Sequence, residues 1–574
     1  MKNGKQMDKD PYLVSLKKRP ADLVVTNATV FNSVTGEFLE DYSVWVSNGT
    51  ICYVGKDSSP VTDASTLNID ARGRVLLPGL IEGHTHILNF IGPYEFISHL
   101  IPSGTTTVIT ETIELASVAG KEGFDYLIKA LADQPIRLYY TISPLCALTP
   151  ELERHAPNPD EYHKYLKDPL CVGLGEIYWA NLLLENQQGQ RVRRLAAMAL
   201  SYGKTVEGHT AGASENKLQA YTSMGVTSCH EPINEQEVID RLRLGYWVMI
   251  RQGSIRQELD AVAGVFSRGV DTRRLIICTD SMDPEQFLTQ GSLDAAVRRA
   301  IELGVAPAKV YQSVTINVAE HFRLDHLLGS ICPGKKADMV LIPRPDDYRP
   351  EKVICNGKVI FDEGQVIAKV RPSTFPGHFF NSVKVARFEM PPTPKKGKVR
   401  VMNLVTRLVS TEEIADLDDP QQRKQLNLLL AVERTGRGGV FLGMIKGLGL
   451  KEGAVGTTMC WDTSDMFVAG CDEGSIRTVI KRLPEIGGGA VLAVGTNVLA
   501  EYPAKLCGIV SLEKMEIAYN QLRKMETMLA ELGVLWEKPM LTLNTLGTAA
   551  IPHLRITHQG YVRLRDRAVL PLEA

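Results

Sequence analysis

The chain of 574 residues has no large excess of charge of either sign. Its 64 Lys and Arg face 66 Asp and Glu, which gives a formal net charge of −2. Such a balance gives no electrostatic reason to expect binding to nucleic acid or to an anionic membrane surface. No apolar run approaches the roughly 18 residues that a membrane-spanning helix needs. We therefore expect neither nucleic acid nor membrane among the partners.

Paired cysteine spacings are also missing. The ten cysteines are scattered and include no Cys-x-x-Cys, which argues against a redox motif or a cysteine-based zinc site. The polar start, residues 1–20, lacks the apolar segment of a secretory signal. We therefore expect reduced, mostly buried thiols in a cytoplasmic protein.

Two histidines one residue apart follow an apolar run. Residues 74–77 predict a buried strand, and the sequence from Pro78 to His86 continues Pro-Gly-Leu-Ile-Glu-Gly-His-Thr-His. Alternate residues of a strand share a face, so His84 and His86 should point the same way. Two imidazoles on one face can hold one divalent metal ion.

More candidate ligands recur downstream, each directly after another apolar strand pattern. They are two carboxylates and two histidines: Glu176, His209, His230 and Asp280. Helical patterns separate these strands, as at 190–202, 235–244 and 292–303. Alternation of strands and helices predicts βαβ units and a parallel sheet. Side chains at successive strand ends of a parallel barrel meet at one face, where they could form one metal cluster.

With these motifs the chain resembles the amidohydrolase superfamily, and within it the bacterial adenine deaminases most closely. The resemblance runs nearly from end to end, and its longest motifs are Gly104-Thr105-Thr106-Thr107-Val108, residues 242–251, residues 296–305, Met540-Leu541-Thr542-Leu543 and Ile551-Pro552-His553-Leu554. It implies an α/β fold: a TIM-like (β/α)8 barrel of the metal-dependent hydrolases, a composite β-sandwich domain and an additional C-terminal α/β domain.

Domain boundaries follow from composition and from the resemblance. We expect residues 20–75 and 323–385 to form the composite β-sandwich and residues 76–322 the barrel. The Pro- and Lys-rich stretch 386–397 reads as a linker, and 398–574 as the C-terminal domain. A helix is predicted over 511–532, and Asn48-Gly49 indicates a hairpin turn.

The resemblance also assigns roles. It implies that the metal ligands are His84, His86, Glu176, His209, His230 and Asp280. Glu176 would bridge two metals, and Asp280 would take a proton from the attacking water and pass it to the leaving nitrogen. One or two divalent ions per chain are implied, and His and carboxylate ligands suit Mn, Fe and Zn alike. We also expect a small heterocyclic substrate, and a homo-oligomer that is a dimer or a tetramer.

Several positions depart from the family pattern. Glu82 replaces an aspartate in the first motif, and polar groups expected near the substrate give way to Leu88, Ile113 and Trp461. We predict a substrate pocket lined by Leu88, Asn89, Ile113, Trp179 and Trp461.

Three functions remain open at this point. One is a metal-dependent deaminase of adenine, giving hypoxanthine and ammonia; the second is a hydrolase of another heterocyclic amine or cyclic amide. The third is a catalytically silent binding paralogue. The complete ligand set argues against the third, because burying ionisable groups is costly without a use for them.

Overall fold

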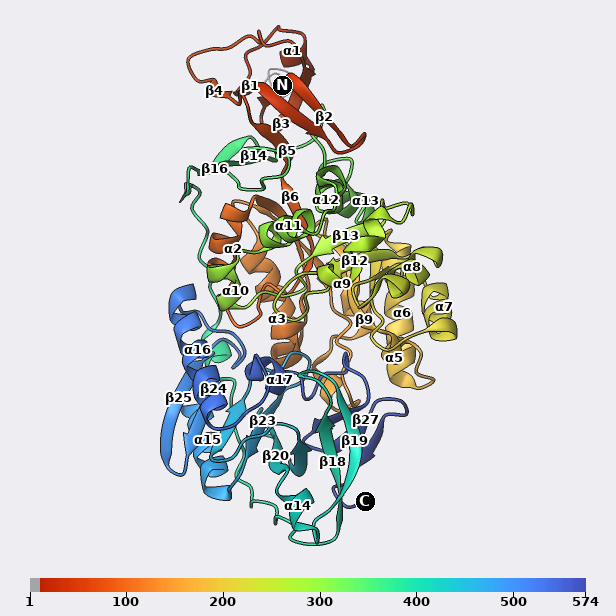
Figure 1. Ribbon diagram of the computed structural model, residues 1–574, viewed down its shortest axis with the longest axis vertical. Helices are drawn as coiled ribbons and strands as arrows, with labels where there is room; N and C mark the ends of the chain where they lie inside the picture. Colours follow the sequence, from red (N-terminus) through yellow and green to blue (C-terminus); the bar gives the residue numbers. More distant parts are fainter. Residues whose placement is uncertain (1–10) are drawn as a thin grey trace.

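The computed structural model describes residues 11–574; the first ten residues, part of the polar start, lie outside this range. Three regions follow one another along the long axis (Figure 1). Strands from both sides of the barrel sequence lie at one end, the barrel lies in the middle, and residues 398–574 lie at the other end. Among the described residues, no helix is both long and apolar enough to span a membrane.

The first region is a nine-stranded sheet made from two separate segments of the chain. Strand β5 joins them, because it pairs parallel with β1 and antiparallel with β14. Asn48 and Gly49 connect β2 to β3 with positive φ angles of 51° and 71°, which confirms the predicted turn. The strands are β1 Leu23–Asn32, β2 Glu37–Ser47, β3 Thr50–Gly55, β4 Leu67–Asp70, β5 Val75–Pro78, β14 Met339–Ile342, β15 Lys352–Cys355, β16 Lys358–Asp362 and β17 Gln365–Val366.

The central region is a parallel barrel. Five strands pair in the order β10-β9-β8-β7-β6 and three in the order β11-β12-β13. The barrel closes where Thr85, at the end of β6, bridges Asp280 after β13, and where Thr227 before β11 donates to the Val206 carbonyl of β10. The strands are β6 Leu80–Thr85, β7 Thr105–Thr110, β8 Arg137–Ile142, β9 Cys171–Tyr178, β10 Thr205–His209, β11 Ser228–Cys229, β12 Trp247–Arg251 and β13 Leu275–Cys278.

Helices surround the barrel, and those predicted from periodicity are present as α6, α8 and α11. Their apolar stripes face the strands, as expected for surface helices. The helices are α2 Pro93–Leu100, α3 Ile113–Leu131, α4 Tyr162–Leu166, α5 Trp179–Leu182, α6 Gln187–Ser201, α7 Glu215–Ser223, α8 Glu235–Arg243, α9 Leu259–Val262, α10 Pro284–Thr289, α11 Leu293–Glu302, α12 Pro307–Ser313 and α13 Ile316–His321.

The apolar run 74–77 does not begin the barrel. It forms β5 of the nine-stranded sheet, and the first barrel strand is β6, which starts at Leu80. Pro78 and Gly79 separate the two strands, and a Cβ on Gly79 would lie 2.2 Å from Thr106 Oγ1. The chain therefore passes from one sheet to the other at a point where only glycine fits.

The C-terminal region contains an eight-stranded sheet in the order β19-β18-β21-β20-β23-β22-β24-β25 and a small sheet, β26-β27-β28. Helix α15 packs on the larger sheet. The elements are β18 Lys398–Leu404, β19 Ser410–Asp416, α14 Pro420–Arg423, β20 Leu426–Glu433, β21 Val440–Lys446, β22 Ala454–Thr457, β23 Asp465–Gly470, α15 Glu473–Glu485, β24 Gly489–Val494, β25 Asn497–Pro503, α16 Met515–Glu531, α17 Pro539–Asn544, β26 Leu554–Thr557, β27 Gly560–Arg563 and β28 Ala568–Leu570.

The predicted helix 511–532 begins later than expected, at Met515. Ser511 instead continues an extended segment, because its N–H donates to the Phe90 carbonyl (2.9 Å) and it forms a bridge with Ile91. A contact with the barrel, distant in sequence, overrides the local helical pattern.

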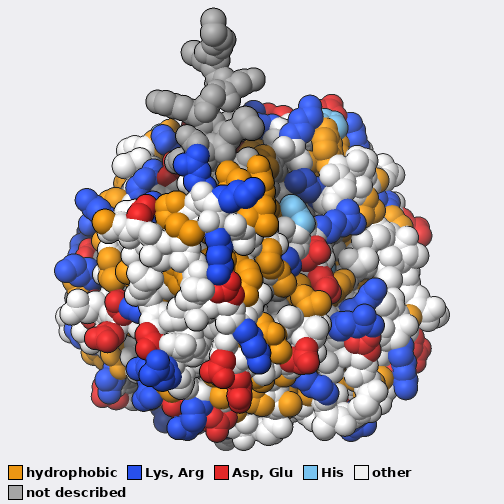
Figure 2. Space-filling view, turned by 90° about the horizontal axis from the view of Figure 1, so that it is seen from above, with side chains coloured by type: hydrophobic (Ala, Val, Ile, Leu, Met, Phe, Trp, Pro, Cys, Tyr) orange, Lys and Arg blue, Asp and Glu red, His pale blue; other side chains and the backbone are white. Residues whose placement is uncertain are grey.

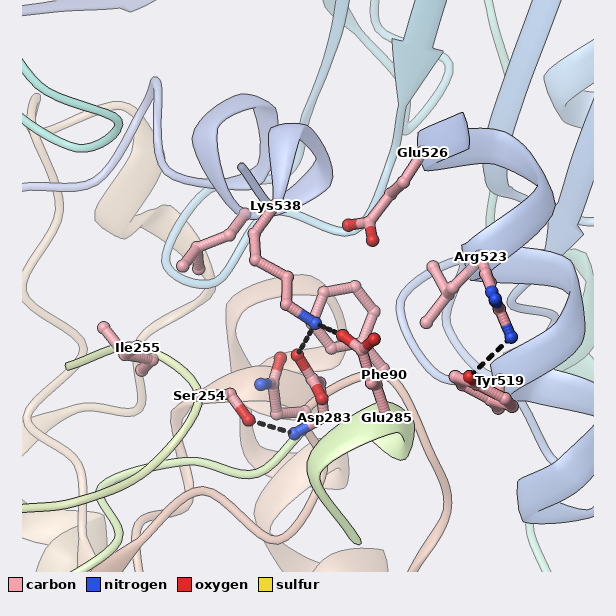
Figure 3. A pocket seen from close by; sticks show the side chains of 12 residues that line it. Phe90, Ser254, Ile255, Asp283, Glu285, Tyr519, Arg523, Glu526 and Lys538 are labelled. Carbon is pink, nitrogen blue, oxygen red and sulfur yellow. Dashed lines mark hydrogen bonds and ion pairs between the residues drawn. The ribbon is translucent and has the colours of Figure 1, made fainter. Parts of the chain in front are cut away.

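The C-terminal region is joined to the barrel by a partly exposed cluster of charges. Lys538 lies 3.0 Å from Asp283 and also pairs with Glu285, both just beyond the last barrel strand (Figure 3). Ser254 Oγ accepts from the Asp283 N–H, which links the same cluster to the loop after β12. These contacts hold the C-terminal region over the carboxyl ends of the strands.

The surface seen from above carries Lys, Arg, Asp and Glu side chains interspersed with one another (Figure 2). This mixture agrees with the near-zero net charge of the sequence. All ten cysteines are free and most are buried, with Cys471 exposed, which confirms the predicted burial of most thiols.

Candidate metal centre and active site

Four histidines converge at the carboxyl ends of the barrel strands. His84 lies in β6, His86 directly after it, His209 at the end of β10 and His230 directly after β11. His209 Nδ1 is 3.1 Å from His230 Nε2, and the His84 and His230 rings stack with centroids 4.2 Å apart. All four rings are at least nine-tenths buried.

Two carboxylates complete the group. Asp280 Oδ1 lies 3.4 Å from His84 Nε2 and 3.8 Å from His86 Nε2. Glu176 Oε1 lies 3.1 Å from His230 Nε2 and also contacts His209, while its Oε2 is 3.7 Å from His86. Glu176 thus lies between the two histidine pairs, and all six predicted ligand positions are brought together.

This donor set fits divalent metal ions. Ligand atoms of His84, His86 and Asp280 lie within 4.8 Å of one another, as do those of His84, Glu176 and His230. His84 Nε2 is buried and has no hydrogen-bond partner. A buried imidazole nitrogen without a partner is costly unless a further group satisfies it, and imidazole and carboxylate together suit Zn, Fe or Mn.

Groups behind the cluster fix the orientation of two rings. His86 Nδ1 is 2.6 Å from Glu114 Oε1, and His209 Nε2 is 3.0 Å from the Ala550 carbonyl oxygen. Each contact leaves the other ring nitrogen facing the cluster. Such partners set the tautomer of a metal-binding histidine and raise its basicity.

The electrostatics keep both carboxylates and His230 in their ligand forms, whereas nearby carboxylates outweigh burial and raise the pKa of the other three histidines, His84, His86 and His209. Burial alone raises the pKa of Glu176, but His209 and His230 outweigh it and hold this pKa well below its usual range. Burial likewise opposes ionisation of Asp280, yet His84 and Arg251 keep its pKa low. Burial and the neighbouring His84 lower the pKa of His230, which favours the neutral imidazole that a metal requires.

Two charged residues of the site escaped the sequence analysis. Glu231 lies 3.3 Å from His209 Nδ1 and 3.4 Å from His230 Nε2, and forms a third group of possible ligands with those histidines. Arg251, at the end of β12, pairs with Glu231 and lies 3.3 Å from Asp280 Oδ2. The signal for Glu231 was its place directly after His230. Arg251 stood in a family motif without an assigned role.

Glu82 lies behind the cluster rather than in it. Its carboxylate accepts from the backbone N–H groups of His84 (3.1 Å) and Thr279 (3.1 Å) and so ties β6 to β13. Burial raises its pKa to about 7. The longer side chain at this position therefore has a structural use, because it reaches the neighbouring strand.

Arg251 offers a stability test. It donates two hydrogen bonds to Glu258, at 3.0 and 2.9 Å, besides its contacts with Glu231 and Asp280. All four groups are largely buried. Arg251→Met leaves three carboxylates without their cation, so we expect the metal-free protein to lose about 3–5 kcal/mol of stability, measured by urea unfolding. A loss below about 1 kcal/mol would contradict this role.

A cavity of about 270 Å³ opens over the cluster. His86, Glu176, His209, His230 and Asp280 form its base; Ile113 and residues of the C-terminal region, including Leu408, Trp461 and Ile551, form its walls. The Trp461 ring lies nearly parallel to that of His86, with centroids 5.8 Å apart and an interplanar angle of 13°.

Three residues predicted to line the substrate pocket lie elsewhere. Leu88 is fully buried in the barrel core, because the chain turns back after His86. Asn89 borders the small cavity beside Lys538. Trp179 donates from Nε1 to the Ala211 carbonyl (2.7 Å) and lines a neighbouring cavity of about 430 Å³.

Comparison with known proteins finds two family matches along the chain. The amidohydrolase family matches residues 75–360, and the adenine deaminase C-terminal domain matches residues 403–568. The fold and site thus define a metal-dependent amidohydrolase, a hydrolase of C–N bonds other than linear peptide bonds.

Relatives place the chain more narrowly. "Adenine deaminase 2" of Carboxydothermus hydrogenoformans is 31% identical over 98% of this chain and 99% of its own length. "Adenine deaminase" of Cenarchaeum symbiosum is 29% identical over 98% and 94%. A solved β-aspartyl dipeptidase from Fervidobacterium islandicum AW-1 is 20% identical and overlaps 60% of this chain and 98% of its own, with a TM-score of 0.45. The chain belongs to the adenine deaminase family.

Proposed function

We propose that this protein deaminates adenine, taking up water and releasing hypoxanthine and ammonia. The observation that carries the proposal is the buried cluster of four histidines and two carboxylates at the base of a cavity, in a chain that matches adenine deaminases over nearly its whole length. The cavity, about 270 Å³, can accept a small heterocycle.

The arrangement of donors supports two metal positions. His84, His86 and Asp280 would hold one ion, and His209, His230 and Glu231 the other. Glu176 has one oxygen toward each histidine pair, which suits a bridging carboxylate. When bound, divalent ions supply a water molecule of lowered pKa, so that hydroxide is available near neutral pH.

The protein residues then handle the proton. Hydrolysis joins a water oxygen to the ring carbon that carries the amino group, and the bond from that carbon to nitrogen breaks. Asp280 has one oxygen toward His84 and the other toward Arg251. Its carboxylate would accept the proton of the attacking water and deliver it to the leaving nitrogen, which departs as ammonia.

A second candidate is also a hydrolysis of a C–N bond, but of a different substrate. Ile113 and Trp461 line the cavity close to His86, where the family pattern has polar groups. A site without those partners loses affinity for polar atoms of the substrate. This observation favours a less polar heterocyclic amine or cyclic amide.

A substrate panel separates the two candidates. Purified, metal-loaded protein is assayed for ammonia release from purines and pyrimidines, and for ring opening of cyclic amides by chromatography. We expect adenine to give the highest kcat/KM, with hypoxanthine as product by chromatography. Faster turnover of another amine with little adenine conversion would favour the second candidate. No ammonia from any amine and no ring opening of any cyclic amide would overturn the proposal. Size-exclusion chromatography with light scattering of the same sample tests the expected dimer or tetramer.

A further inference from the structure

A short segment of the C-terminal region contacts one of the cluster histidines. The Ala550 carbonyl oxygen is 3.0 Å from His209 Nε2, so the proton of this imidazole lies on Nε2. Nδ1 is then the nitrogen left for a metal ion, and it faces Glu176 and His230. The two residues come from regions 341 positions apart, so the tautomer of His209 depends on where residues 548–550 lie.

Asp462 holds that segment in place. Its Oδ2 accepts hydrogen bonds from Thr548 Oγ1 (2.8 Å) and from the Ala549 N–H (3.0 Å). Thr548 Oγ1 in turn accepts from the Ala550 N–H (3.1 Å). Asp462 is only 5% exposed and does not line the cavity over the cluster.

The neighbouring residue contacts a second cluster histidine. Trp461 stacks on His86, and Glu114 contacts Nδ1 of the same ring. One dipeptide of the C-terminal region therefore acts on both halves of the cluster: Trp461 packs on His86, and Asp462 reaches His209 through Thr548 and Ala550.

We infer that Asp462 is a positioning residue of the metal centre, which sets the orientation and tautomer of His209 through the 548–550 segment. The C-terminal region is then part of the metal site and not only a cover over it. The inference rests on the metal centre of the proposed function, and it concerns the half formed by His209, His230 and Glu231.

The test measures metal binding as well as activity. Wild type and Asp462→Ala are made metal-free and titrated with Co²⁺, with affinity and stoichiometry read from the visible absorption and by competition with a chelator. We expect the site on the His209 side to bind about 10–100-fold more weakly in Asp462→Ala, the usual effect of losing such a supporting group. Asp462→Asn keeps an oxygen acceptor and should restore most of the affinity.

Two further variants separate positioning from general stability. Thr548→Val removes the hydroxyl between Asp462 and the Ala550 N–H, and should weaken the same site even if Asp462→Ala does not fold. Asp465→Ala is the matched control: Asp465 is a fully buried carboxylate of the same region, and its two hydrogen bonds go to His558, away from the cluster. It should leave Co²⁺ binding unchanged.

The outcomes distinguish this inference from the proposed function. Unchanged Co²⁺ affinity in Asp462→Ala and Thr548→Val, or an equal loss in Asp465→Ala, overturns the positioning role while the metal centre stands. Wild type that binds no Co²⁺ overturns the metal centre itself.

Discussion

Asp280→Asn should lower kcat by about two to four orders of magnitude, the usual contribution of a positioned general acid–base group. The asparagine has nearly the same shape and can still accept from Arg251, so the fold should be retained. An amide cannot take up and return a proton near neutral pH. Because the lost step belongs to the transition state, kcat and kcat/KM should fall together. Steady-state kinetics with adenine measure both.

Asp283→Asn is the control for this variant. Asp283 lies three residues further along the same loop and caps helix α10 through the Gln286 N–H (2.8 Å), and asparagine is an equally good cap. Because Lys538 still pairs with Glu285 in this variant, its rate should stay close to that of the wild type. Near-normal turnover of Asp280→Asn, with metal content unchanged, would show that another group moves the proton.

Removal of metal should reduce deamination about 1,000-fold or more, and returning Zn²⁺, Fe²⁺ or Mn²⁺ should restore it. Metal ions stabilise the transition state by several kcal/mol, and about 4 kcal/mol corresponds to about a thousand-fold. The measurement follows hypoxanthine formation before and after chelation, with residual metal counted by elemental analysis.

Two outcomes bear on this prediction. Full activity in protein whose metal content is close to zero would contradict a metal-dependent reaction. Glu176→Gln should not recover when metal is returned, because the bridging charge between the histidine pairs is missing; recovery to the wild-type rate would show that Glu176 does not bridge.

The barrel and its ligand positions could be predicted because each depends on local pattern. A histidine directly after an apolar strand, as at His209, has one place to lie once the strand belongs to a parallel barrel. Glu176 and Asp280 were predicted in the same way, because each also follows an apolar strand pattern. Where a turn is encoded by two residues, as at Asn48-Gly49, the sequence alone was again sufficient.

Contacts between distant segments could not be predicted in the same way. Arg251 pairs with Asp280, and Ala550 meets His209, only after the whole chain has folded. Leu88 was expected in the pocket because it follows His86, but the direction of a loop after a strand is set by tertiary packing. Strand β5 looked like the start of the barrel because an apolar run does not reveal which sheet it joins.

Anomalous diffraction from crystals of the metal-loaded protein tests the central claim most directly. The account predicts two peaks at the barrel mouth, one beside His84, His86 and Asp280 and one beside His209, His230 and Glu231, with Glu176 between them. Each peak should lie about 2.0–2.2 Å from its nitrogen and oxygen ligands. Crystals with no metal peak at the barrel mouth, or with metal peaks only at other places in the protein, would contradict it.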